Sequence, residues 1–331
     1  MTIPTKMQAI IVKEPGKNSQ LTVDILAMPI ANREQLLIKV AAAGINRADL
    51  VQRQGFYPPP KGESDILGLE VAGVVVAAPD NLQHWLGKKV FGIVPGGGYA
   101  EYALLHHQHA MLVPEGFSMS QAAAVAEVFL TAYQLLFLHG QLQAEQKVLI
   151  HAGASGVGTA AIQLAKYVGA KVAVTASNEE KLTLCKQLGA DVTINYKQEP
   201  FELALTKHWP DGADLILDPV AGDYIQRDVS VLALDGKIVI YAMMGGRKLP
   251  ELDLAPLLKQ RGHIICSTLR NRSDEYKADL TARFISQCGD ALKEGILKPI
   301  VFEQFHWHDA AKAHQLMVSN QTQGKLILNF D

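Results

Sequence analysis

A glycine-rich turn carries the clearest chemical signal in the sequence. Residues 151–159 read HAGASGVGT, directly after the apolar run 148–150 and directly before an amphipathic stretch, 159–168. Glycines in a strand-to-helix turn let the backbone approach a pyrophosphate, while free N–H groups and the positive end of the helix dipole face the phosphates. The spacing departs from a strict G-x-G-x-x-G because Ser155 stands three residues before Gly158, and we expect its hydroxyl to contact phosphate. The turn predicts a dinucleotide site, with a tight turn lacking a ligand as the alternative.

The end of the next apolar strand indicates which dinucleotide binds. An NAD site usually places Asp or Glu there to bond the ribose 2′-OH. Here residues 175–178 read TASN, which is neutral, and Lys181 follows. Hydroxyl and ammonium groups suit a 2′-phosphate, so the sequence predicts NADPH over NADH. A solvated helix residue is the alternative for Lys181, and Glu179 and Glu180 weaken the local positive field.

The chain that must position this turn is long and apolar. Its 331 residues are 48% hydrophobic and 19% charged, which is enough for two packed domains and excludes disorder. Its net charge of −2 argues against a nucleic-acid partner. Three widely spaced cysteines predict neither a disulfide framework nor a cysteine zinc site. A short polar start, from Met1 or from Met7, and no apolar run approaching roughly 20 residues predict a cytoplasmic protein without a membrane segment.

Two patterns of apolar residues divide the chain. Over the first ~120 residues, short β-branched stretches separated by turn signals predict a mainly β domain. From about Ser120 a helical pattern leads into alternating apolar strands and amphipathic helices, which indicate a parallel sheet covered on both faces. The predicted fold class is α/β, with a doubly wound, six-stranded parallel Rossmann sheet. The strands expected in the first domain are 7–12, 36–40, 71–76, 89–94 and 99–103; those of the Rossmann sheet are 148–150, 172–174, 192–194, 215–217, 238–240 and 264–266; helices are expected at 178–188 and 273–294, and a final strand at 325–329 rejoins the first domain.

Four segments in this order resemble the medium-chain dehydrogenase/reductases along essentially the whole chain. They are 44–50 (GINRADL), 68–73 (GLEVAG), 96–102 (GGGYAEY) and the turn at 151–159. Within that superfamily the chain is most similar to the zinc-free, zeta-crystallin-like NADPH:quinone oxidoreductases, and within those to the tumour-suppressor-inducible quinone oxidoreductase subfamily. The resemblance implies a GroES-like catalytic domain at 1–124 and 267–331, a Rossmann NADPH-binding domain at 125–266, and an active site in the cleft between them.

The zinc-dependent alcohol dehydrogenases of the same superfamily differ from this sequence at their metal ligands. Those enzymes hold catalytic zinc with a Cys in the region that corresponds to Asn46 and with the His of a G-H-E motif. This chain has no thiolate there, and Leu69 stands in place of the His. The cysteine-rich loop of their structural zinc is also missing. No metal is expected, and the chemistry is expected to rest on the cofactor.

The resemblance also implies which residues surround the cofactor and the substrate. Asn46 would hydrogen-bond the cofactor or a substrate carbonyl, and Tyr57, beside three prolines, would line the pocket or donate to a quinone oxygen. A turn-capping side chain and a surface aromatic are the respective alternatives. Met243 and Met244 have core packing as their alternative. The implied cofactor positions are Thr131 near the nicotinamide; Gly156 and Val157 at the pyrophosphate; Ser177, Lys181 and Tyr196 around the adenosine phosphate; Met243 and Met244 at the cleft, where the fifth strand ends; Ser267 and Leu269 toward the nicotinamide half; and Asn320, where relatives can place an arginine on the phosphate.

The expected function is NADPH-dependent, zinc-independent reduction of quinones or other small conjugated carbonyl compounds. Quinones accept hydride readily and give a stable hydroquinone anion, so no strong general acid is required. Two other functions stay open: an enoyl or enone (C=C) reductase, and a crystallin-like or RNA-binding protein that holds the cofactor with little turnover. The resemblance further implies a homodimer, or a tetramer, through the edge strand at 264–266.

The densest histidine group is interpreted without a metal. His106, His107 and His109 are expected at a solvated strand end, because no carboxylate or thiol at a telling spacing completes a ligand set. His306 and His308 have the same interpretation. Cys185 lies on one helix face with two leucines and is expected in the core.

Overall fold

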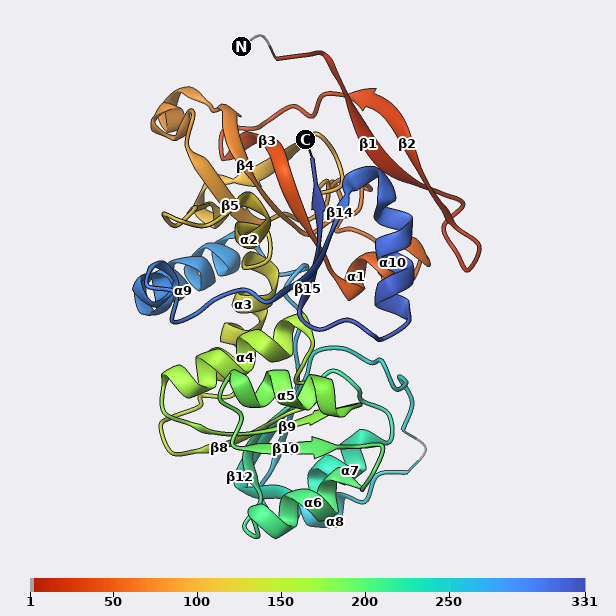
Figure 1. Cartoon of the computed structure of the whole chain (residues 1–331), viewed down its shortest axis with the longest axis vertical. Helices are drawn as coiled ribbons and strands as arrows, with labels where there is room; N and C mark the ends of the chain where they lie inside the picture. Colours follow the sequence, from red (N-terminus) through yellow and green to blue (C-terminus); the bar gives the residue numbers. More distant parts are fainter. Residues whose placement is uncertain (1–2, 250, 331) are drawn as a thin grey trace. The chain divides into compact units, whose positions relative to one another are not determined.

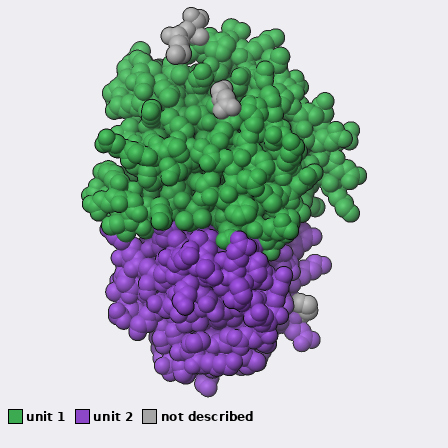
Figure 2. Space-filling view, in the orientation of Figure 1, with its two compact units in different colours: residues 1–130, 269–331 green, residues 131–268 purple. Residues whose placement is uncertain are grey.

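The computed structural model, which describes residues 3–249 and 251–330, contains one large parallel sheet and one large, mostly antiparallel sheet. Met1, one of the two expected starts, lies outside the described residues. The tertiary contacts divide the chain into two compact units, residues 1–130 with 269–331 and residues 131–268 (Figure 2). Residues 125–130 and 267–268 thus group differently from the expected division of the chain.

The parallel sheet of the second unit contains all six expected strands. Its order is β10-β9-β8-β11-β12-β13, which is the order of a doubly wound dinucleotide fold, and the predicted fold class is confirmed. Helices α4 and α5 pack against one half of this sheet (Figure 1). The bounds are β8 (Lys147–Ile150), β9 (Lys171–Ala176), β10 (Val192–Asn195), β11 (Ala213–Asp218), β12 (Leu232–Ile240), β13 (His263–Cys266), α4 (Gly156–Tyr167), α5 (Glu179–Gln187), α6 (Phe201–His208), α7 (Tyr224–Ser230) and α8 (Leu254–Lys259).

Local chemistry explains where the first two helices of this unit begin and end. Ser155 caps the start of α4 and Asn178 caps the start of α5, each accepting a hydrogen bond from a backbone N–H in the first turn. Gly169 and Gly189 follow the helix ends with φ values of +81° and +107°, a conformation that glycine adopts without strain. The apolar strands between the helices form the core of the unit, with Leu149 and Ile216 wholly buried.

The sheet of the first unit has the order β14-β15-β3-β4-β5-β7, with β6 also paired to β3. The last strand rejoins this sheet as expected, because β15 runs antiparallel to β3 with Leu326 opposite Ile45. A separate hairpin of β1 and β2 completes the strands (Figure 1). The bounds are β1 (Lys6–Lys13), β2 (Gln20–Ala27), β3 (Gln35–Ile45), β4 (Glu70–Ala77), β5 (Lys89–Ile93), β6 (Tyr102–His106), β7 (Met111–Leu112), β14 (Val301–His306), β15 (Lys325–Asn329), α1 (Arg47–Arg53), α2 (Met119–Ala122), α3 (Ala126–Tyr133), α9 (Asp274–Lys293), α10 (Ala310–Val318) and the 3-10 turns η1 (Asp80–Trp85), η2 (His107–His109) and η4 (Trp307–Asp309).

The structure corrects the expected strand at 99–103 and the expected strand end at the histidines. Strand β6 begins only at Tyr102, because the Tyr99 carbonyl instead accepts a hydrogen bond from the Ile10 N–H at 2.8 Å. Residues 107–109 form the 3-10 turn η2, and His109 is buried rather than solvated. Burial lowers the pKa of His109 to about 4, so its ring is neutral at physiological pH. The other expected solvated pair, His306 and His308, is exposed.

The expectation of no long apolar stretch is also wrong. Residues 119–139 form a helical stretch of 21 residues that is long and apolar enough, by length and composition, to cross a membrane. It comprises α2, α3 and the π-helical turn η3 (Gln134–His139). Because 72% of its apolar window is buried inside the protein, it has the character of a core helix.

Candidate functional site

The glycine-rich turn forms an anion-binding helix start between β8 and α4. Ser155 Oγ accepts a hydrogen bond from the Gly158 N–H at 3.0 Å. The N–H groups of Gly156 and Val157 lie in the first helical turn, where no helix carbonyl is available to accept them. Residues 155–157 are also partly exposed, so a ligand can reach them. This arrangement is suited to a phosphate, with the Ser155 hydroxyl hydrogen still able to donate.

The turn is packed too closely to hold side chains at two of its glycines. A Cβ at Gly158 would collide with the carbonyl oxygens of Ala152 and Gly153. A Cβ at Gly153 would lie 2.7 Å from Val174 Cβ on the next strand. The glycines therefore allow the close approach of α4, β8 and β9 that places the helix start at the end of the sheet, and the residues present fit a dinucleotide phosphate.

Two residues expected around the adenosine phosphate lie at the same edge of the sheet as the turn. Ser177 directly follows β9 and Tyr196 directly follows β10, and these two strands are neighbours in parallel register. The Tyr196 N–H donates to the Ala176 carbonyl at 3.2 Å, which holds the strand ends together. Lys181 lies in the first turn of α5 but is only 6% exposed, so the interpretation as a solvated helix residue is wrong.

Residues expected at the cleft and toward the nicotinamide half lie after the strands at the other side of this sheet. Met243 and Met244 follow β12 and are 61% and 49% exposed, which rules out core packing. Ser267 follows β13 and is buried, with its hydroxyl oxygen 3.0 Å from His139 Nε2 in η3. Thr131 is buried on α3. Thus Ser155, Ser177, Tyr196, Met243 and Ser267 all follow the carboxyl ends of parallel strands, where this fold binds its ligands.

A buried histidine at the first position of the glycine-rich turn bonds to two neighbouring elements, a role that the sequence did not reveal. His151 Nδ1 lies 2.9 Å from Thr175 Oγ1 on β9, and His151 Nε2 lies 2.8 Å from Asp228 Oδ1 on α7. Both members of the His151–Asp228 pair are wholly buried. Burial raises the pKa of Asp228 to about 6, and the neighbouring imidazole opposes that increase. The pair connects the first residue of the turn to two other elements of the unit.

In the first unit, Asn46 forms a buried polar cluster with two residues from distant parts of the chain. Its Nδ2 donates to Glu70 Oε1 at 3.0 Å, and its Oδ1 accepts from Lys325 Nζ at 2.7 Å. Lys325 Nζ also lies 2.7 Å from Glu70 Oε1 and donates to the Ile45 carbonyl at 2.7 Å. Asn46 is at the same time the N-cap residue of α1, where it forms a capping box with Asp49, so its capping role and its place in this cluster occur together. At this turn the carboxylate of Asp49 accepts from the Asn46 N–H at 2.8 Å.

This cluster does not fit a zinc ion. The positions that would supply a thiolate and an imidazole hold an amide and a leucine, and an ammonium group lies against the neighbouring carboxylate. Zinc in proteins takes thiolate, imidazole or carboxylate ligands, and a fixed positive charge in the same place repels it. Across residues 3–249 and 251–330, no group of three or more His, Cys, Asp or Glu side chains is arranged to hold a metal ion.

Tyr57 is partly buried and contacts Arg270, which lines a small pocket of the first unit. Arg270 connects its loop to the glycine-containing loop at 95–98, because its Nη1 donates to the Tyr57 carbonyl at 3.2 Å and its Nε to the Pro95 carbonyl at 2.8 Å. The guanidinium carbon lies 5.4 Å from the centre of the Tyr57 ring. Burial raises the pKa of the Tyr57 phenol, Glu127 adds to that increase and Arg270 opposes it.

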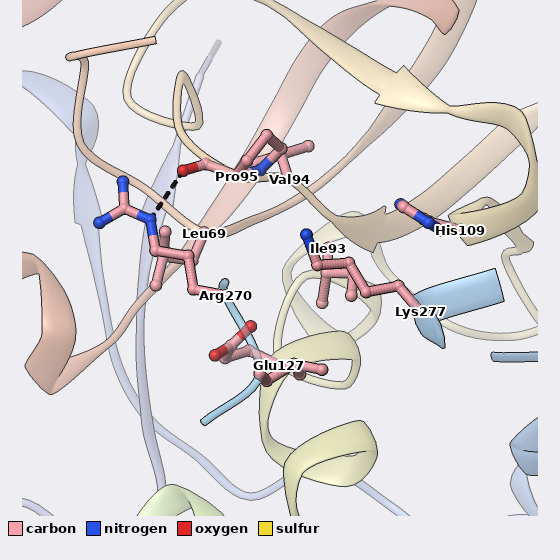
Figure 3. Close-up of a pocket in the computed structure, with 9 residues that line it drawn as sticks. Leu69, Ile93, Val94, Pro95, His109, Glu127, Arg270 and Lys277 are labelled. Carbon is pink, nitrogen blue, oxygen red and sulfur yellow. Dashed lines mark hydrogen bonds between the residues drawn. The ribbon is translucent and has the colours of Figure 1, made fainter. Parts of the chain in front are cut away.

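Figure 3 shows the pocket itself, which has a volume of about 10 Å³ and is lined by Leu69, Glu127, Leu269, Arg270 and Lys277 among others. The carboxylate of Glu127 lies on the side of the pocket that Leu69 and Arg270 form (Figure 3). Burial raises the pKa of Glu127 to about 8, and Glu70 adds to the increase. Leu269, expected at the cofactor, thus lines this pocket. Asn320, which was also expected at the cofactor, is exposed and follows α10 with a φ of +56°.

Comparisons with known proteins match both units. Residues 32–115 match the family model of the alcohol dehydrogenase GroES-like domain, and residues 156–286 match that of the zinc-binding dehydrogenases. The chain is 31% identical to human quinone oxidoreductase over 92% of its own length and 91% of the relative's. The quinone oxidoreductase of Thermus thermophilus, whose structure has been solved alone and in complex with NADPH, is 29% identical, with a TM-score of 0.82 over 98% of this chain and 100% of that one. A mycobacterial protein solved with NADPH is 26% identical, with a TM-score of 0.86 over 98% and 100%.

Proposed function

Because the chain belongs to the medium-chain dehydrogenase/reductase superfamily and is an NADPH-dependent oxidoreductase, we propose that it reduces quinones and that it does so without zinc. The observation that carries the zinc-free part of this proposal is the Lys325 ammonium, which contacts the Asn46 amide and the Glu70 carboxylate. The similarity to quinone oxidoreductases supports the choice of substrate class.

Bound NADPH supplies the hydride, and the residues of this chain bind and orient the reactants. Ser155 and the N–H groups of Gly156 and Val157 would hold the pyrophosphate, while Ser177, Lys181 and Tyr196 would hold the adenosine phosphate. The Tyr57 phenol is protonated at neutral pH, and burial raises its pKa further above the ordinary value, so it can donate a hydrogen bond to a carbonyl oxygen of the substrate. Asn46, held by Glu70 and Lys325, would orient the cofactor or the substrate beside the positive charge of Lys325.

A panel of substrates tests the proposed activity. We expect purified protein to oxidise NADPH with ortho- or para-quinones faster than with enones or enoyl thioesters, because a quinone needs no strong general acid after accepting hydride. The measurement is NADPH absorbance at matched substrate concentrations. Oxidation with the C=C substrates alone would make the chain an enoyl or enone reductase. Tight NADPH binding without oxidation by any substrate would favour the binding-protein alternative.

Metal removal tests the zinc-free part of the proposal separately. We expect dialysis against a strong chelator, and later addition of zinc, to leave kcat and KM unchanged within about twofold, because the Lys325 ammonium repels a dication at Glu70. Metal content measured by mass spectrometry accompanies the kinetics. One bound zinc per chain, with activity lost on its removal, would contradict this expectation.

A further inference from the structure

Arg270 is a buried charge for which the proposed reaction gives no direct use. It is only 6% exposed, and its guanidinium forms no ion pair with any residue in the described parts of the chain. Burial lowers its pKa, which reflects the free energy spent in removing the charge from water. A buried cation without a bonded carboxylate is expensive, so a specific geometric role for the guanidinium is the simplest explanation.

The geometry of its hydrogen bonds indicates that role. The planar fork donates from Nε to the Pro95 carbonyl and from Nη1 to the Tyr57 carbonyl, and so fixes two loops to each other. The same group lies over the Tyr57 ring at 5.4 Å, within the range of a cation–π contact. Arg270 therefore contacts Tyr57 at both its backbone and its ring.

The third guanidinium nitrogen of Arg270, Nη2, makes neither of these contacts, and Arg270 also lines the pocket. Arg270 Nη2 is buried and has no hydrogen-bond partner among the described residues, and Arg270 lines the same pocket as Glu127. The charged groups that act on Arg270 are Tyr57, Asp49, Glu127 and Glu63, while Lys277 and Lys325 act on Glu127. Glu127 is thus the acidic residue whose charge acts on both Arg270 and Tyr57, and among the described residues it is bonded to neither.

We propose that Arg270 is a positioning residue for Tyr57: it fixes the loop that presents the phenol and places a positive charge against the ring, and the negative charge of Glu127, which lines the same pocket, opposes the effect of that charge on the phenol. This inference rests on the proposed function only where it assigns Tyr57 a part in substrate binding. The positioning itself is a property of the first unit and is measured without substrate.

Two variants separate the charge of Arg270 from its shape. Arg270→Met removes both the charge and the fork, whereas Arg270→Lys keeps a charge and loses the second planar donor. Arg283→Met is the matched control, because Arg283 is an exposed arginine on α9 that bonds to Asp279. Circular dichroism and a thermal melt establish that each variant is folded, and Arg270→Lys keeps the test usable if Arg270→Met does not fold.

The first readout is the phenol titration of Tyr57, obtained by ultraviolet difference between each protein and the same protein carrying Tyr57→Phe. We expect Arg270→Met to raise the pKa of Tyr57 and Glu127→Gln to lower it, because Glu127 is ionised in the range where a tyrosine titrates. The second readout is hydrogen exchange of residues 54–61, which we expect to accelerate at least about threefold in both Arg270 variants and to stay unchanged in Arg283→Met. Unchanged titration together with unchanged exchange in Arg270→Met would overturn the proposal.

The third readout is kinetic and is tied to the proposed function. We expect Arg270→Met to lower kcat/KM for a quinone at least about tenfold, and the double variant Arg270→Met/Tyr57→Phe to be no slower than Tyr57→Phe alone, since two residues acting as one unit are not additive. Additive losses would contradict positioning through Tyr57. If the wild-type protein reduces no quinone, the proposed function fails while the titration and the exchange still decide the role of Arg270.

Discussion

Three oxygen atoms surround the ammonium group of Lys325, and this contact determines what the neighbouring residues can do. The Ile45 carbonyl, Asn46 Oδ1 and Glu70 Oε1 all lie 2.7 Å from Nζ. Lys325 and Glu70 are almost wholly buried, so neither charge is stabilised by water. At the scale of single residues, an internal cation satisfies the carboxylate in a place where zinc-dependent relatives would be expected to hold a metal.

Removing the ammonium leaves the buried carboxylate unpaired. We expect Lys325→Met to lower the free energy of unfolding by about 3–5 kcal/mol, the usual effect of deleting one partner of a buried pair. Chemical denaturation measures this free energy of unfolding. The double variant Lys325→Met/Glu70→Gln should recover part of the loss. The control is Lys312→Met, which removes an exposed partner of Asp309 and should cost less than about 1 kcal/mol. Equal effects of Lys325→Met and Lys312→Met would show that the cluster does not stabilise the fold.

At the scale of elements, the proposed cofactor site depends most directly on the strand-turn-helix of β8 and α4. Gly158 lies in the first turn of α4, where backbone carbonyl oxygens of the preceding turn occupy the space of a side chain. Backbone atoms cannot move aside as the end of a flexible side chain can. Any side chain at this position must therefore shift the helix start away from the sheet, together with its free N–H groups.

A single added methyl group tests this packing. We expect Gly158→Ala to weaken NADPH binding at least about tenfold, because the N–H groups of Gly156 and Val157 move relative to the phosphates. The measurement is the dissociation constant by calorimetry or nucleotide fluorescence. Gly289→Ala is the matched control: it lies within α9, its Cβ would meet Ile285 at an ordinary 3.5 Å, and alanine is the better helix former. Equal affinity in Gly158→Ala and wild type would exclude this turn from phosphate binding.

At the scale of the whole molecule, β13 forms one end of the parallel sheet. Within residues 3–249 and 251–330 it pairs with β12 alone, and its end residues His263 and Cys266 are exposed. The preceding helix α8 exposes Leu254 and Leu258 as well. An open strand edge beside exposed apolar side chains is the kind of surface through which a second copy of the chain pairs across a two-fold axis.

Self-association can be measured directly. We expect light scattering to give the mass of two chains, and Leu258→Glu to shift the protein toward the mass of one chain of 36.0 kDa, because a charge at an apolar interface is costly. Leu203→Glu is the control, since Leu203 is an exposed leucine on α6. A single-chain mass for the wild type at micromolar concentration would contradict the dimer.

The sequence by itself determined the strands of the parallel sheet and the glycine-rich turn. Each of the six parallel strands is a short apolar run between helical stretches, and the turn at 151–159 combines glycines with a capping serine within nine residues. These features are local, because strand and helix periodicity and turn chemistry depend on neighbouring residues in the chain. The positions after the strand ends, such as Ser177 and Tyr196, followed from the same local pattern together with the family resemblance.

Only the tertiary structure decided which charged groups meet. Lys325 contacts Asn46 and Glu70 because β15 pairs with β3, and Arg270 reaches Tyr57 across 213 positions of the chain. Buried His109 is a further case in which surroundings, rather than the local sequence, set the outcome. Burial and ion pairing depend on long-range packing, which no local pattern encodes, so the residues around the proposed substrate site became apparent only once the strands were paired.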